Sequence, residues 1–162
     1  MDFMDNVNLI LQNKIFKDAL MKNMECEEHR KFCCHDLTHF LDVARIAYIV
    51  NLENKFNLKK EVIYAAAILH DIGRWMEYKE GIPHHIASVR LASTILSQCN
   101  FKEDDTSQII ESISQHRDNN IKRSKLSEII YLGDKLSRNC FYCSSYGECK
   151  WSEEKKNNRL KY

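Results

Sequence analysis

The sequence has very few residues that interrupt regular structure, since its 162 residues include only one proline and four glycines. Proteins built from many short strands, and doubly wound α/β proteins, need more such turn residues, so the low count favours an all-α fold. No segment alternates apolar and polar residues with the period of a strand, whereas helical periodicity recurs along most of the chain. We therefore predict an all-α protein.

Long apolar runs and an excess of one charge are also missing. The longest apolar run, Val62 to Leu69, is far shorter than the roughly 20 residues that cross a bilayer, so no membrane partner is expected. The net charge is only +1, and no nucleic-acid polymer is expected as a partner. The first residues carry no Lys or Arg ahead of their apolar stretch, so we expect no secretory signal and a cytoplasmic protein whose seven cysteines are reduced.

The apolar periodicity predicts about six helices in a single domain. They span residues 5–22, 36–54, 59–71, 84–98, 104–118 and 126–139. We expect the domain to occupy residues 1–139, with residues 140–162 forming a cysteine-containing extension packed on it. Gly133 lies inside an expected helix, where glycine costs about 1 kcal/mol relative to alanine, so a close approach of another element is predicted there.

Several ionisable residues fall on or beside the apolar faces of these helices. They are His39, His70, Asp71, His84, His85, His116 and Asp134. One buried histidine is common in a core, but a buried carboxylate costs several kcal/mol unless a cation or strong donors compensate. Two carboxylates together with up to five inward-facing histidines therefore indicate one or two bound metal ions. Nitrogen and oxygen ligands together suit Fe, Mn, Co, Ni or Zn better than Ca or Mg.

The order of these residues resembles that of the HD-domain superfamily of metal-dependent phosphohydrolases. The matching residues are His39 in HDLTHFLDVAR, the pair His70 and Asp71 in LHDIGR, and Asp134 in YLGDKLSR. The resemblance spans residues 35–139 and implies a bundle of about six helices. It also implies that these four residues bind a first metal ion, with His70 and Asp71 at the catalytic centre.

Some members of the superfamily bind a second metal ion through two further histidines. His84 in GIPHHIASVRLA and His116 in SISQHRDN match those positions, and His85 could replace His84 or contact substrate. The resemblance then implies that Asp71 bridges the two ions, as in the diadenosine tetraphosphate hydrolase branch. Such ions lower the pKa of water, so that hydroxide becomes available to attack phosphorus.

Basic residues beside the motifs are candidates for binding phosphate, or are simply solvated, since the chain has 24 Lys and Arg. They are Arg74, Arg117, Lys135 and Arg138. Arginine suits this role because its guanidinium binds phosphate through two hydrogen bonds. His35 lies one turn before His39 and could support a ligand, act as a ligand or general acid, or lie on the surface.

The C-terminal cysteines form a separate pattern that the resemblance does not include. Cys140, Cys143 and Cys149 supply three of the four ligands of a structural zinc site. Cys26, Cys33, Cys34 or a histidine could supply the fourth. Redox-active thiols and ordinary thiols are the alternatives.

The function predicted is hydrolysis of a phosphoester or phosphoanhydride in a small nucleotide-like substrate. Two other functions fit parts of the same pattern. One is a di-iron oxygenase, because some HD-like proteins use a similar ligand set for oxygen chemistry. The other is a non-catalytic regulatory module that binds a metal or a nucleotide.

Overall fold

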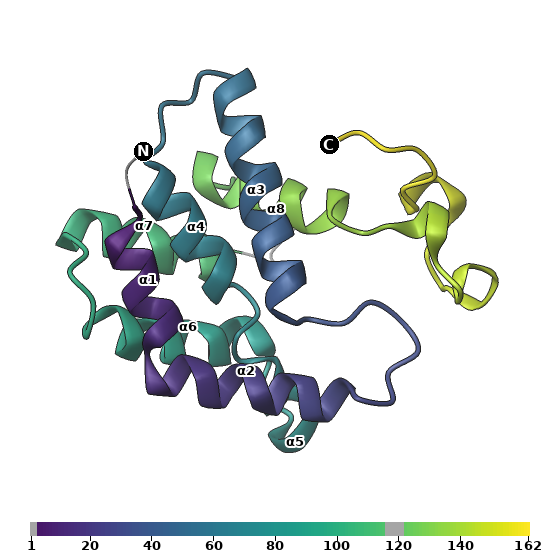
Figure 1. The fold of residues 1–162 in the computed structure, drawn as a ribbon, viewed down its shortest axis with the longest axis horizontal. Coiled ribbons are helices and arrows are strands. Elements are labelled where there is room, and N and C mark those ends of the chain that lie inside the picture. Colours follow the sequence, from purple (N-terminus) through teal and green to yellow (C-terminus); the bar gives the residue numbers. More distant parts are fainter. Residues whose placement is uncertain (1–2, 116–121) are drawn as a thin grey trace.

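The computed structural model describes residues 3–115 and 122–162, which form helices and loops without a strand (Figure 1). The predicted all-α class is confirmed. The α-helices in this part of the chain are α1 (Asp5–Gln12), α2 (Lys14–Glu27), α3 (Leu37–Glu53), α4 (Lys60–Leu69), α5 (Arg74–Glu80), α6 (His84–Leu96), α7 (Glu103–Ser114) and α8 (Lys125–Leu136). Three 3₁₀ turns follow, η1 (Cys140–Tyr142), η2 (Tyr146–Glu148) and η3 (Glu153–Lys155). None of the helices described is long and apolar enough to span a bilayer.

The described residues contain two more α-helices than the six expected. The first expected helix is divided at Asn13, whose side chain caps α2 by accepting hydrogen bonds from the backbone N–H groups of Ile15 and Phe16, at 2.8 and 3.3 Å. Helix α2 then continues to Glu27, five residues beyond the predicted end. The sequence analysis did not predict helix α5, because this helix buries none of its own residues and so has no apolar stripe.

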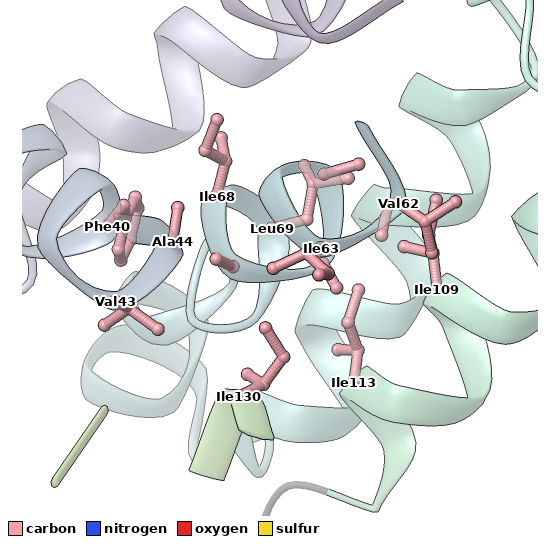
Figure 2. Close-up of a cluster of buried hydrophobic side chains, with 14 of the residues drawn as sticks. Phe40, Val43, Ala44, Val62, Ile63, Ile68, Leu69, Ile109, Ile113 and Ile130 are labelled. Atoms are coloured by element: carbon pink, nitrogen blue, oxygen red, sulfur yellow. The ribbon is translucent and has the colours of Figure 1, made fainter. Parts of the chain in front are cut away.

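Helix α4 forms the centre of the core. It is apolar on almost every side, and its residues from Val62 to Leu69 are buried apart from Tyr64. Figure 2 shows side chains of α4 between Phe40 and Val43 of α3 and Ile109 of α7, with Ile130 of α8 nearby. This packing places the C-terminal end of α4, where the His70–Asp71 pair follows, among the other helices.

Helices α3 and α8 approach each other closely at Gly133, as predicted. A Cβ atom added to Gly133 would lie 2.8 Å from the backbone oxygen of Val43 and 3.3 Å from its Cγ1. Only glycine fits this contact without a shift of one helix. The contact holds Asp134 beside the first turn of α3.

The C-terminal segment, residues 140–162, lies beyond the end of α8 (Figure 1). The side-chain amide of Asn157 donates hydrogen bonds to the carbonyl oxygens of Lys135 and Arg138, at 2.7 and 2.9 Å. The hydroxyl of Ser145 donates to the carbonyl of Lys31, at 2.8 Å. These bonds attach the segment to the end of α8 and to the loop before α3. Its status as an extension of a 1–139 domain remains a prediction.

Candidate metal centre

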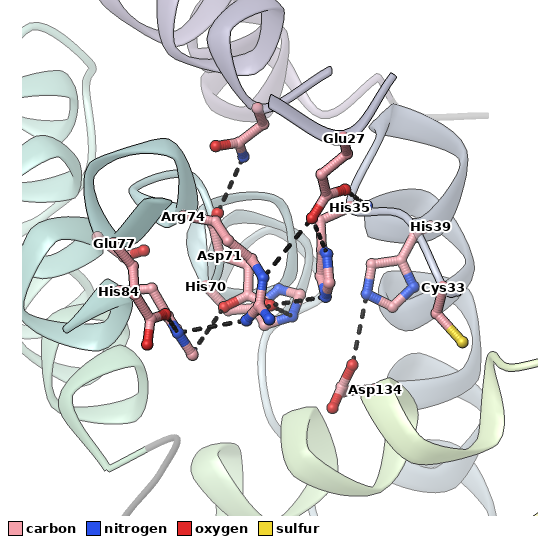
Figure 3. Close-up of polar contacts among 12 residues, drawn as sticks. Glu27, Cys33, His35, His39, His70, Asp71, Arg74, Glu77, His84 and Asp134 are labelled. Atoms are coloured by element: carbon pink, nitrogen blue, oxygen red, sulfur yellow. Dashed lines mark hydrogen bonds and ion pairs between the residues drawn. The ribbon is translucent and has the colours of Figure 1, made fainter. Parts of the chain in front are cut away.

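Three helices bring together His39, His70 and Asp134. His39 lies in the first turn of α3, His70 follows α4, and Asp134 lies near the end of α8. One ligand atom from each lies within 4.8 Å of the others, and Nε2 of His39 is 3.4 Å from Oδ1 of Asp134 (Figure 3). Within residues 3–115 and 122–162, no other three His, Cys, Asp or Glu side chains converge this closely.

Local hydrogen bonds position His70 and His39, and the hydroxyl of Ser137 lies 3.3 Å from Nδ1 of His39. Nδ1 of His70 lies 2.6 Å from the carbonyl oxygen of Ala67, and because a carbonyl only accepts, Nδ1 carries the proton. Nε2 of His70 is therefore the nitrogen with a lone pair for a metal ion. The side chain of Asp36 caps α3 by accepting a hydrogen bond from the backbone N–H of His39, at 2.8 Å.

Asp71 contacts His70 of this group and two further histidines, His35 and His84. Its Oδ2 atom is 3.6 Å from Nε2 of His70 and 3.5 Å from Nε2 of His35. Its Oδ1 atom is 3.2 Å from Nε2 of His84. The two carboxylate oxygens thus face opposite sides of the site, which is the arrangement that a bridging ligand needs.

Arg138 and Lys135 keep the Asp134 carboxylate charged. Nη2 of Arg138 lies 3.0 Å from Oδ1, and Nζ of Lys135 lies 2.9 Å from Oδ2. Burial raises the pKa of Asp134, but the hydrogen bond with His39 and the positive charge of Arg138 outweigh burial and hold the pKa well below its usual value. Asp134 is therefore an anion at neutral pH, as a metal ligand must be.

The structure adds two carboxylates that the sequence analysis missed, Glu27 and Glu77. Glu27 is buried, and its carboxylate contacts His35 twice, at the backbone N–H (2.6 Å) and at Nδ1 (2.7 Å). Burial raises the pKa of Glu27, but hydrogen bonds from His35 and Tyr78 outweigh burial and lower it to about 2. Glu77 hydrogen-bonds Nδ1 of His84. Each carboxylate orients a histidine whose other nitrogen faces Asp71.

A cavity of about 370 Å³ opens onto the centre. Its lining includes His35, Asp71, His84 and Asp134, the predicted basic residues Arg74, Lys135 and Arg138, and also Arg30, Tyr131 and Trp151. His85 is half-buried, with its ring 6.2 Å from that of His84, and does not belong to this lining. His116 and Arg117 lie outside the described residues.

The donors present fit a divalent transition-metal ion. Two imidazoles and a buried anionic carboxylate on separate helices are typical ligands for such ions. On the far side of Asp71, the described residues offer His84 for a second ion.

The predicted zinc ligands Cys140, Cys143 and Cys149 do not converge in this way. They are half-buried free thiols. No three cysteine sulfurs of the described residues lie within 4.8 Å of one another. A single zinc ion bound through bonds of about 2.3 Å would bring its sulfur ligands to about 3.8 Å.

The HD domain family model matches residues 36–139, which cover more than half of the chain. The chain belongs to the HD domain family. The match includes His39, His70, Asp71 and Asp134, but it excludes Glu27, His35 and the C-terminal segment.

Among related sequences, an uncharacterized protein of Clostridium beijerinckii is 43% identical over 159 residues, which cover 98% of this chain and 100% of that protein. Ribonuclease Y of Mesoplasma florum is 30% identical over 101 residues, 62% of this chain. Ribonuclease Y of Mycoplasma mycoides is 26% identical over 101 residues. The matches span only 18% and 22% of the two ribonucleases.

A solved structure has the same fold. The crystal structure of a predicted HD superfamily hydrolase from an uncultured Thermotogales bacterium aligns with a TM-score of 0.63. The alignment covers 87% of this chain and 80% of that one. At 21% identity, this similarity shows the HD-domain fold alone.

Proposed function

We propose that the protein is a metal-dependent phosphohydrolase that cleaves a phosphoester or phosphoanhydride bond in a small nucleotide-like substrate. The main support is the convergence of His39, His70 and Asp134 within 4.8 Å, beside the Asp71 carboxylate and under a cavity lined with basic residues. Divalent ions bound by these residues would activate water and neutralise phosphate charge.

The basic residues of the cavity would hold the phosphate. Arg74, Lys135 and Arg138 come from two sides of the site, and each contacts a carboxylate of the centre. Guanidinium groups bind phosphate oxygens in pairs, and lysine adds a point charge. These side chains would orient the substrate so that its phosphorus faces Asp71.

His35 is positioned to accept a proton at the same centre. Because its Nδ1 hydrogen-bonds to Glu27, Nε2 is the nitrogen that faces Asp71 at 3.5 Å. Burial lowers the pKa of His35, so the ring is neutral at pH 7 and this nitrogen can accept a proton or bind a metal ion.

The size of the substrate is part of the proposal. A cavity of about 370 Å³ fits a small phosphate compound. The two ribonuclease Y relatives make RNA the competing substrate. A panel of mononucleotides, dinucleoside polyphosphates and a short oligoribonucleotide separates the two.

The decisive experiment combines elemental analysis of the purified full chain with this panel. We expect Asp71→Ala to lose turnover and bound metal while its far-UV circular dichroism is unchanged. Asp42→Ala is the matched control, because Asp42 is a partly exposed aspartate on α3 that pairs with Arg45. Full activity in Asp71→Ala, or after exhaustive chelation, would refute the proposal. Oxygen consumption without phosphate release would instead identify an oxygenase, and nucleotide binding without turnover would identify a regulatory module.

A further inference from the structure

A second cavity, of about 440 Å³, lies next to the candidate metal centre and contains a cluster of thiols. Four of the seven cysteines line it. They are Cys33 from the loop before α3, and Cys140, Cys143 and Cys149 from the C-terminal segment. The other three cysteines, Cys26, Cys34 and Cys99, do not belong to this lining. Cysteines from two distant parts of the sequence thus share one cavity.

Basic residues predominate in the lining of this thiol cavity, and three of them pair with carboxylates outside the lining: Lys31 with Glu148, Lys156 with Glu153 and Arg138 with Asp134. Five basic residues line it, and no Asp or Glu is among its lining residues. The five are Arg30, Lys31, Arg138, Lys150 and Lys156. Metal ions and iron–sulfur clusters bind cysteine as the thiolate, whose negative charge basic side chains can balance. The cavity therefore suits an anionic centre with several thiolate ligands.

The spacing of the sulfurs indicates what kind of centre fits. No three of the four sulfurs lie within 4.8 Å of one another, whereas the ligands of one tetrahedral ion stand about 3.8 Å apart, so a larger centre fits their present spacing better. An iron–sulfur cluster of the [4Fe–4S] type also takes four cysteines, but each binds a different iron. The cysteine sulfurs that bind it therefore stand farther apart, with the iron–sulfur core filling the space between them.

We propose that Cys33, Cys140, Cys143 and Cys149 bind a [4Fe–4S] cluster. Four thiolates give the cluster a net negative charge, which the basic residues of the lining would partly balance. The cluster would join the loop before α3 to the C-terminal segment, the same two parts that the Ser145–Lys31 hydrogen bond connects.

The two cavities share three lining residues, Arg30, Arg138 and Trp151. Arg138 interacts with the Cys33 thiol on one side and with Asp134 on the other (Figure 3 shows Cys33 and Asp134). A cluster in the thiol cavity would therefore fix one wall of the phosphate-binding cavity.

The test is anaerobic purification of the full chain, followed by reconstitution with equal amounts of ferrous and ferric iron and with sulfide. Acid-labile sulfide is the decisive readout, because iron alone could also occupy the His39–His70–Asp134 centre. We expect about four sulfides per chain and the broad visible absorbance of a cluster. Cys143→Ser should lose both signals. Cys34→Ser, which alters the exposed neighbour of Cys33 outside the cavity, should keep them.

Asp71→Ala should also retain the sulfide, so that failure of the proposed hydrolase and failure of the cluster can be distinguished. Wild-type protein without sulfide after reconstitution would overturn the cluster, whatever the folding of the cysteine variants. One zinc ion per chain that is lost in Cys143→Ser would overturn it in favour of a single ion. Equal sulfide contents in Cys143→Ser and Cys34→Ser would also overturn the cluster proposal.

Discussion

Gly133 of α8 lies directly against the backbone carbonyl of Val43 on α3, so close that an added Cβ would stand 2.8 Å from the oxygen. Nothing larger than hydrogen fits between the two helices at this point. The neighbouring residue, Asp134, thereby reaches to within 3.4 Å of Nε2 of His39. Helix packing and the geometry of the metal centre depend on the same contact.

Gly133→Ala should therefore destabilise the protein. Overpacking costs about 1–3 kcal/mol, and alanine returns about 1 kcal/mol as the better helix former, so the net loss should be up to about 2 kcal/mol. Urea unfolding followed by circular dichroism measures it. Gly147→Ala is the control, because its added Cβ would meet no atom within 4 Å. Identical midpoints for the two variants would contradict the close approach.

Glu27 should make stability depend on acid pH. Its folded pKa, about 2, lies below the ordinary value of 4.5, so the ionised carboxylate stabilises the fold above about pH 4.5 and this contribution disappears as the pH falls toward 2. The difference in unfolding free energy between wild type and Glu27→Gln should shrink over that range. Glu25→Gln, an exposed change on the same helix, should parallel wild type. A difference that stays constant with pH would count against this role.

Glu77 should tune metal binding without touching the metal itself. Its hydrogen bond to Nδ1 of His84 directs Nε2 toward Asp71, and loss of such an outer partner weakens metal affinity by about 10- to 100-fold. Calorimetric titration of metal-free protein with Mn²⁺ compares Glu77→Gln with Glu80→Gln, an exposed change on α5. Equal affinities in the two variants would show that Glu77 does not position His84.

Trp151 should help to bind substrate. Its ring lies 5.0 Å from Cζ of Arg138 and 5.3 Å from Nζ of Lys135, so it holds both cations at the cavity. At about 0.5–1 kcal/mol for each contact, Trp151→Leu should raise KM for the phosphate substrate about fivefold or more, with a smaller effect on kcat. Tyr142→Leu, at an exposed aromatic of the same segment, is the control. A fall in kcat at constant KM would argue against a binding role.

Much of the fold follows from apolar periodicity, because most helices bury a face. The same rule explains why helix α5 and the boundary between α1 and α2 were not predicted. Helix α5 buries no residue and leaves no periodic signal, and the cap at Asn13 divides two helices whose apolar residues read as one pattern. Gly133 was informative because a helix keeps an internal glycine only where something must come close.

The residues of the centre were predictable for a different reason. Ionisable groups on apolar faces stand out, which identified His39, His70 and Asp134. Glu27 carried a weaker signal of the same kind, since it continues the buried series Phe16, Ala19 and Asn23 at helical spacing. The predicted helix ended at residue 22, so that signal was lost. Glu77 could not be found, because its helix was not predicted.

The hydrogen bonds between Glu27 and His35 limit where the chain can be truncated without altering the site. The region shared with the family starts at residue 36, one position after His35. A fragment cut at that border would keep every residue of the family signature, yet it would leave Asp71 facing solvent where an imidazole backed by a carboxylate now stands. Useful truncations should therefore begin upstream of α2.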